Sequence, residues 1–151
     1  MKKYKLLTDD TITIGGHQLY RIEALRDFLG VKKGDKGGYV ESEDNLSHDG
    51  FCWVFDNAAV YGGACVYGDA WVRNRAEIYG NALVYDNAKV YGDAMIYDNA
   101  KVYDFANVYG FTDVYGNAQV NGNAQVDGMT EVYGDMWLGG NSWVTGGSLT
   151  K

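Results

Sequence analysis

The chain has 151 residues, a formal net charge of −7 at pH 7, 21 glycines and no proline. This length suits one domain with a small appendage, and the excess of acidic groups argues against broad binding to nucleic-acid backbones, which needs positive charge. The absence of proline favours uninterrupted strand ladders, because a missing N–H would leave a neighbouring carbonyl unpaired.

Cys52 and Cys65 are the only cysteines. Two such thiols make neither a disulfide framework nor a set of metal ligands, so we expect no metal site and no cofactor. Residues 1–10 carry charges and no apolar run follows them, so the sequence predicts neither a signal peptide nor a membrane span. We therefore expect a cytoplasmic protein.

Residues 1–45 form the first predicted unit, an N-terminal β cap with its connector. Segments 3–7, 11–14 and 17–24 have the composition of strands and are separated by turn residues. A short antiparallel sheet of these strands should lie across the open end of the next unit, because repeat domains cap their exposed strand edges. Residues 31–45 are rich in Lys, Gly, Glu and Asp, which predicts a solvated connector, with a functional loop as the alternative.

Residues 46–151 form the second predicted unit and carry a repeat of six residues. Leu46 and His48 fit the small and aliphatic positions of an imperfect first repeat. From Val54 to Val144 an aliphatic residue then recurs at every sixth position through 16 consecutive hexads, mostly with a small residue two positions earlier. A helix would repeat its apolar residues at spacings of three and four, so this period excludes one long helix.

Each hexad is interpreted as a short strand, Ala-X-Val, followed by a turn. The turn residues are Gly, Asn and Asp, which tolerate left-handed backbone angles. The Ala and the aliphatic residue lie two positions apart on the strand and therefore point to the same side. The chain should thus turn a corner every six residues and keep these side chains inside.

This repeat resembles the left-handed parallel β-helix of the hexapeptide-repeat family, in which three hexads make one triangular coil. The resemblance covers residues 54–144 and departs from the family after the aliphatic residue, where this chain mostly has Tyr. It implies an all-β fold, a left-handed parallel β-helix of about five coils behind the β cap. The form Val-Tyr-Gly-Asn-Ala, with the leader residues 19–28 and 37–43, is also similar to uncharacterised phage and prophage proteins, which implies a place in the host-cell cytoplasm.

Residues 18 apart should stack in such a helix, which sorts its exterior into three faces. The first face carries an unbroken tyrosine ladder: Tyr61, Tyr79, Tyr97, Tyr115 and Tyr133. The second face carries a shorter one: Tyr67, Tyr85 and Tyr103. Stacked rings can simply shield the backbone, or the first ladder can be a self-association surface. The family resemblance implies a homotrimer.

The third face departs most from the repeat, at residues 70–75. Its expected outward side chains combine cations with aromatic rings: Trp53, Phe55, Trp71, Arg73, Arg75, Lys89 and Tyr91. On an otherwise acidic chain this group would suit an anionic planar ligand such as a nucleotide, through charge-assisted hydrogen bonds and stacking. Alternatively, the two arginines pair with Asp69, Asp93 or a neighbouring subunit.

Four further aromatic residues interrupt the repeat towards its end: Phe105, Phe111, Trp137 and Trp143. We interpret them as a contact surface between subunits or with a partner. The alternative is that the two tryptophans, with Leu149, only close the last coil.

Three classes of function follow from these patterns. Acyl transfer is the activity that the family resemblance implies, but general-base catalysis needs a positioned base and no histidine follows His48. A structural or polymer-forming rod conflicts with two ends that look capped. We therefore expect a non-catalytic phage or prophage accessory protein that antagonises a host defence, either by sequestering a nucleotide signal or by occluding a host protein. We expect neither membrane contact nor direct nucleic-acid binding.

Overall fold

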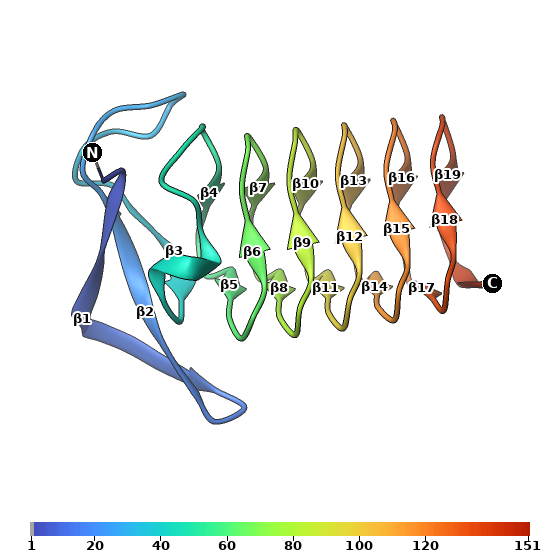
Figure 1. The fold of residues 1–151 in the computed structure, drawn as a ribbon, viewed down its shortest axis with the longest axis horizontal. Coiled ribbons are helices and arrows are strands. Elements are labelled where there is room, and N and C mark those ends of the chain that lie inside the picture. Colours follow the sequence, from blue (N-terminus) through green and yellow to red (C-terminus); the bar gives the residue numbers. More distant parts are fainter. Residues whose placement is uncertain (1) are drawn as a thin grey trace.

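The computed structural model describes residues 2–151 as a long stack of short strands with a β-hairpin at its N-terminal end (Figure 1). Within these residues the one helix is a short 3-10 turn, η1 (Glu43–Asn45). No helix in this part of the chain is long and apolar enough to cross a membrane.

The N-terminal hairpin consists of β1 (Tyr4–Ile14) and β2 (His17–Ala24), which pair antiparallel. The next strand, β3 (Lys36–Val40), pairs antiparallel with β2 and parallel with β5 (Ala59–Val60). The predicted N-terminal antiparallel sheet is therefore present. It shares one nine-stranded sheet with the first face of the stack, and β3 connects the two parts.

The stack has three faces, each a parallel sheet in which a strand pairs with the strand three places later in the chain. The first face contains β5, β8 (Glu77–Ile78), β11 (Met95–Ile96), β14 (Asp113–Val114), β17 (Thr130–Tyr133) and β20 (Gly147–Thr150). The second face contains β6 (Cys65–Val66), β9 (Leu83–Val84), β12 (Lys101–Val102), β15 (Gln119–Val120) and β18 (Trp137–Leu138). The third face contains β4 (Trp53–Val54), β7 (Trp71–Val72), β10 (Lys89–Val90), β13 (Asn107–Val108), β16 (Gln125–Val126) and β19 (Trp143–Val144).

The corners between the faces depend on left-handed backbone conformations. Every sixth residue from Asp56 to Gly140 has a positive φ, and each is Gly, Asp or Asn. Where the residue is Asp, its side chain can also bond to the next turn: Asp104 Oδ2 accepts a hydrogen bond from the Gly122 amide at 2.9 Å. The turn residues of the hexad therefore shape one corner and fasten it to the following one.

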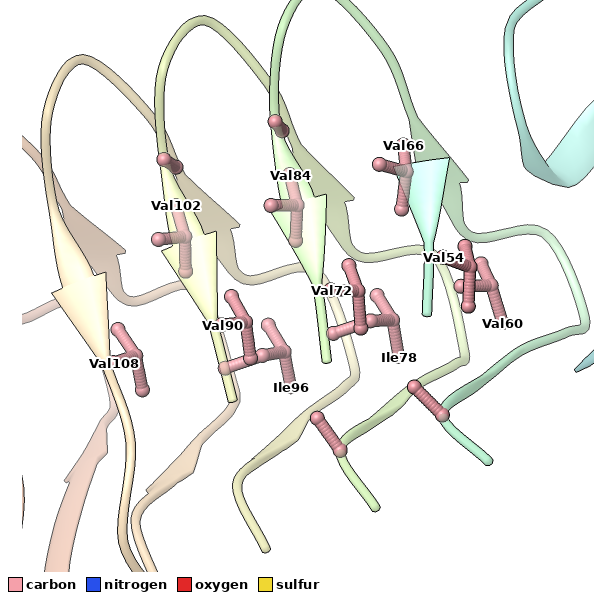
Figure 2. Packing of buried hydrophobic residues seen from close by; sticks show 14 of the residues in the cluster. Val54, Val60, Val66, Val72, Ile78, Val84, Val90, Ile96, Val102 and Val108 are labelled. Carbon is pink, nitrogen blue, oxygen red and sulfur yellow. The ribbon is translucent and has the colours of Figure 1, made fainter. Parts of the chain in front are cut away.

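The core is a column of aliphatic and alanine side chains inside the three faces. Figure 2 shows the valines and isoleucines of successive turns lying above one another, from Val54 to Val108. The side chains of both hexad positions are buried through most of the stack. Each buried valine contributes on the order of 1.5 kcal/mol, and neighbouring turns share that surface. The predicted fold class is confirmed: the chain is an all-β parallel β-solenoid behind an N-terminal antiparallel sheet.

The solenoid has about six turns, one more than the hexads alone predict. The additional turn comes first, because β3 pairs with β5 and Leu46 forms a bridge with Val66. Leu46 thus occupies the aliphatic position that the sequence assigned to His48. His48 instead stacks on the ring of Tyr4, with centroids 4.2 Å apart.

The prediction of a solvated connector over residues 31–45 is wrong for its central part. Residues 37–40 are buried in β3. The two glycines allow the strand to approach the solenoid: a Cβ on Gly37 would collide with the Val54 carbonyl oxygen, and one on Gly38 with that of Ala58. Gly37-Gly38 therefore marks close backbone packing.

A candidate ligand-binding face

The third face presents cations beside aromatic rings on two neighbouring strands, β7 and β10. Trp71 and Lys89 point outward because Val72 and Val90, which follow them, are buried in the core and side chains alternate along a strand. The strand register pairs Trp71 directly with Lys89. The Lys89 ammonium lies 5.6 Å from the centroid of the Trp71 ring.

Arg73 lies against two aromatic rings. Its guanidinium carbon is 4.0 Å from the centroid of the Phe55 ring and 4.8 Å from that of Trp71, and the two rings meet edge to face at 5.5 Å. Such cation–π contacts hold a guanidinium in place. Neither Arg73 nor Lys89 forms an ion pair within residues 2–151.

Two shallow hollows lie beside these cations. The first is lined by Leu29, Asp69, Trp71, Asn87, Lys89 and Phe105. The second is lined by Trp71, Arg73, Lys89, Tyr91 and Asn107. Because Trp71 and Lys89 line both hollows, the two form one continuous surface. The sequence predicted four of the five residues that line the second hollow. Of the first hollow it missed Leu29, which comes from the cap, and Asp69 and Asn87, which come from a corner.

Arg75 belongs to a different arrangement. Its Nε lies 2.8 Å from Asp93 Oδ1, and its Nη2 donates to Asp93 Oδ2 at 3.2 Å. This is the ion pair that the sequence allowed as an alternative to ligand binding. The structure therefore separates the two arginines: Asp93 engages Arg75, while Arg73 has no acidic partner in the described chain.

Trp53 points away from the solenoid interior, in register with Trp71, but it is not accessible to a ligand as the prediction required. Only 1% of its surface is exposed, because the cap covers this first rung of the third face. Its ring meets Phe28 at 5.2 Å and Tyr4 at 6.2 Å, both edge to face. Trp53 is a core residue and takes no part in the candidate face.

Tyr91 continues the aromatic surface along the third face. It stacks on Tyr109 with centroids 4.7 Å apart, and burial raises its pKa above the ordinary tyrosine value. The neighbouring Asp127 carboxylate, together with burial, raises the pKa of Tyr109 to about 12. Both phenols are therefore neutral hydrogen-bonding groups at physiological pH.

The tyrosine ladder of the first face is stacked throughout. Adjacent rings from Tyr61 to Tyr133 lie with centroids 5.0 to 5.1 Å apart and nearly parallel planes. Burial raises the pKa of Tyr97 to about 12. Tyr61 is itself buried, with His17 of the hairpin 5.2 Å from its ring, so the accessible ladder begins at Tyr79.

The aromatic residues that interrupt the repeat are exposed. Trp137 and Trp143 expose 68% and 70% of their surfaces, because both precede the inward residue of their strands. Phe105 and Phe111 are exposed at corners. The tryptophans therefore do not close the last coil, while Leu149 packs partly against the core. Their role as a contact surface stays a prediction.

Each of the two histidines is paired with a glutamate of the cap. His17 Nδ1 lies 2.9 Å from Glu41 Oε2, and His48 Nε2 lies 2.7 Å from Glu43 Oε1. The first pair lies within the cap, the second joins the cap to the start of the solenoid, and neither lies on the third face. Within residues 2–151 no three His, Cys, Asp or Glu side chains are grouped so that they could hold a metal ion.

Comparison with known proteins concerns the repeat. A protein-family model described as the YdcK beta solenoid repeat matches residues 76–92, which include β8, β9 and β10. No curated protein matches the chain. The chain is thus similar to β-solenoid repeat proteins, in agreement with its fold. The match describes a structural repeat and indicates no activity.

Proposed function

We propose that this is a non-catalytic binding protein whose third face takes an anionic planar ligand, such as a nucleotide. The observation that carries the proposal is the Arg73 guanidinium, which lies against two aromatic rings and forms no ion pair in the described chain. This is notable because the chain has 20 acidic residues. Lys89 supplies a second cation beside the same hollows.

The chemistry of these groups matches such a ligand. A guanidinium donates hydrogen bonds in a fixed fork that fits phosphate and carboxylate oxygens. Trp71 and Tyr91 offer aromatic surface for a planar ring, and stacking of a base on an aromatic side chain contributes about 1–3 kcal/mol. The cations would therefore bind the phosphate of a nucleotide, and the aromatic rings would stack on its base.

The pair of arginines provides the test. Arg73→Ala should weaken the binding of a mononucleotide by roughly 10- to 100-fold, because a hydrogen bond to a charged group contributes about 1.5–3 kcal/mol. Arg75→Ala should leave the affinity nearly unchanged, because Asp93 already engages that side chain. Isothermal titration calorimetry with a panel of cyclic and linear mononucleotides measures both.

Lysine variants extend the comparison. Lys89→Ala should weaken binding, whereas Lys101→Ala removes the lysine at the same repeat position of the second face and should not. Equal effects of Arg73→Ala and Arg75→Ala, or no binding by any nucleotide of the panel, would refute the proposal.

Self-association is the second part of the proposal, with a homotrimer as the expected state. The accessible ladder from Tyr79 to Tyr133 and the exposed corner aromatics support it, since large exposed aromatic surfaces are typical of interfaces. Native mass spectrometry measures the number of subunits directly. A monomer at all working concentrations would exclude this part.

The biological setting rests on the similarity of the repeat to phage proteins. In that setting the ligand would be a nucleotide signal of a host defence, held by the third face and so removed from its receptor. Native mass spectrometry of protein purified from host cells would then show a retained mass of nucleotide size. A ligand-free protein would favour occlusion of a host protein.

A further inference from the structure

The first hollow has a regular wall at the corner between the second and third faces. Asp69, Asn87 and Phe105 occupy the same repeat position in three successive turns and line this side. Turns of a parallel sheet lie about 4.8 Å apart, so the row is about 10 Å long, close to the length of a purine. Trp71 and Lys89 lie on the third-face side of the same hollow.

The cap adds an unusual residue to this hollow. Leu29 has a φ of 27° and exposes 58% of its surface while lining the hollow. The positive φ belongs to the two-residue turn Leu29-Gly30, whose neighbours Phe28 and Val31 exchange backbone hydrogen bonds. The turn holds the Leu29 side chain at the hollow, where it adds apolar surface on which a ring could lie.

The row changes from polar to apolar along its length. Phe105 offers a ring, Asn87 an amide and Asp69 a carboxylate, which only accepts hydrogen bonds when ionised. The Phe51 amide donates to Asp69 Oδ1 at 3.0 Å and holds the carboxylate in place. Asp69 Oδ2 accepts no hydrogen bond within residues 2–151, so it is free to accept from a ligand.

An anchored carboxylate selects a ring edge that carries N–H donors. Guanine has two adjacent donors, N1–H and the 2-amino group, whereas adenine has an acceptor at N1 and no 2-amino group. The second hollow, with Arg73 and Lys89, begins at the same Trp71 and would hold the phosphate. We infer that the ligand of the third face is a guanine nucleotide, with its base beside Asp69 and its phosphate on Arg73 and Lys89. This inference rests on the proposed function.

Three mononucleotides test the assignment on the unmodified protein. GMP should bind roughly 10- to 100-fold more tightly than AMP, as expected for a charge-assisted hydrogen bond. IMP keeps N1–H but lacks the 2-amino group, so its affinity should fall between the two. Isothermal titration calorimetry measures all three under one buffer and salt condition.

Asp69→Asn assigns the preference to the carboxylate. This variant keeps an oxygen for the Phe51 amide but loses one acceptor, so GMP affinity should fall towards that of AMP while AMP affinity stays unchanged. Asp135→Asn is the matched control, because Asp135 holds the same repeat position at another corner. Circular dichroism checks that both variants are folded. If Asp69→Asn does not fold, the affinity ranking of GMP, IMP and AMP on the unmodified protein decides the assignment.

The outcomes separate the two proposals. Equal binding of GMP and AMP, with a loss in Arg73→Ala, would overturn the guanine assignment and leave the anion site intact. If none of the three mononucleotides binds either the unmodified protein or Arg73→Ala, both the anion site and the guanine assignment would be refuted.

Discussion

Single residues at the corners allow the chain to turn every six residues. Asp104 shows the two requirements together: its φ is 57°, and its Oδ2 accepts the Gly122 amide of the next turn at 2.9 Å. Glycine meets only the first requirement, since it has no side chain to bond with. Asn and Asp meet both, which explains why these three residue types alternate at the corners.

Variants of Asp104 separate the two contributions. Asp104→Ala should reduce the free energy of unfolding by about 2 kcal/mol, because alanine is disfavoured in the left-handed region and the hydrogen bond is lost. Asp104→Gly loses only the hydrogen bond, so its cost should be about half as large, and Asp104→Asn should be close to neutral. Urea denaturation measures the series. Equal stability of the alanine and glycine variants would show that the backbone conformation contributes nothing.

The candidate site also depends on single residues, because neighbouring arginines have different partners. Arg75 at a corner reaches Asp93 of the next turn, while Arg73, which directly follows β7, lies over Phe55 and Trp71. A surface ion pair of this kind stabilises little. Its main consequence is that Arg75 is engaged and Arg73 is available.

At the scale of elements, β3 determines how the cap is attached. It pairs with β2 on one side and β5 on the other, so the hairpin extends the first face. A Cβ on Gly38 would lie 2.7 Å from Val54 Cγ1 and collide with the Ala58 carbonyl. The strand therefore needs glycine for its distance from the solenoid.

Gly38→Ala should loosen the cap. Overpacking at such a contact costs about 1–3 kcal/mol, and the affected amides are those of β2 and β3. Hydrogen exchange measured by mass spectrometry should show faster exchange there than in β8 to β17. Gly16→Asn is the control, because a Cβ at Gly16 meets nothing within 4 Å and Asn tolerates a positive φ. Unchanged cap protection in Gly38→Ala would show that the strand can shift to accommodate a methyl group.

At the scale of the whole molecule, carboxylates of the cap region fasten it to the solenoid. Glu41 accepts the Gly62 amide of the first face at 2.8 Å and contacts His17, and the bond to His17 holds its pKa below the ordinary value of 4.5. Glu43 has a lowered pKa because of its bonds to His48 and Lys2. Both groups favour the folded cap only while they are ionised.

The cap should therefore be acid-sensitive. A carboxylate whose pKa is lower in the folded state stabilises the fold above its unfolded pKa and loses this effect as the pH falls through the folded value. Exchange of β1 and β2 amides should thus rise below about pH 4.5, relative to the solenoid. The double variant Glu41→Gln and Glu43→Gln should show fast cap exchange at pH 7 and a weaker pH dependence. Parallel acid responses of wild type and double variant would contradict this role.

The sequence by itself determined the periodic part of this protein. The hexad, with its fixed small, aliphatic and turn positions, placed the core and the corners, and the resemblance to coils of three hexads placed the tyrosines from Tyr61 to Tyr133 in one stacked ladder. The outward positions of Trp71, Arg73 and Lys89 followed for the same reason. The period fixed these places because each turn repeats the contacts of the previous one.

Only the tertiary structure decided the rest, because those contacts join segments that share no period. The cap buries Trp53 and places Lys3 in the core, where its ammonium donates to the Cys52 carbonyl at 2.7 Å. Leu46 displaces His48 from the core, and Leu29 reaches a hollow formed by residues of three turns. The pairing of Arg75 with Asp93 depends on the local geometry of one corner. Spacing assigns a side chain to a face, whereas its partners depend on what the rest of the chain brings to that face.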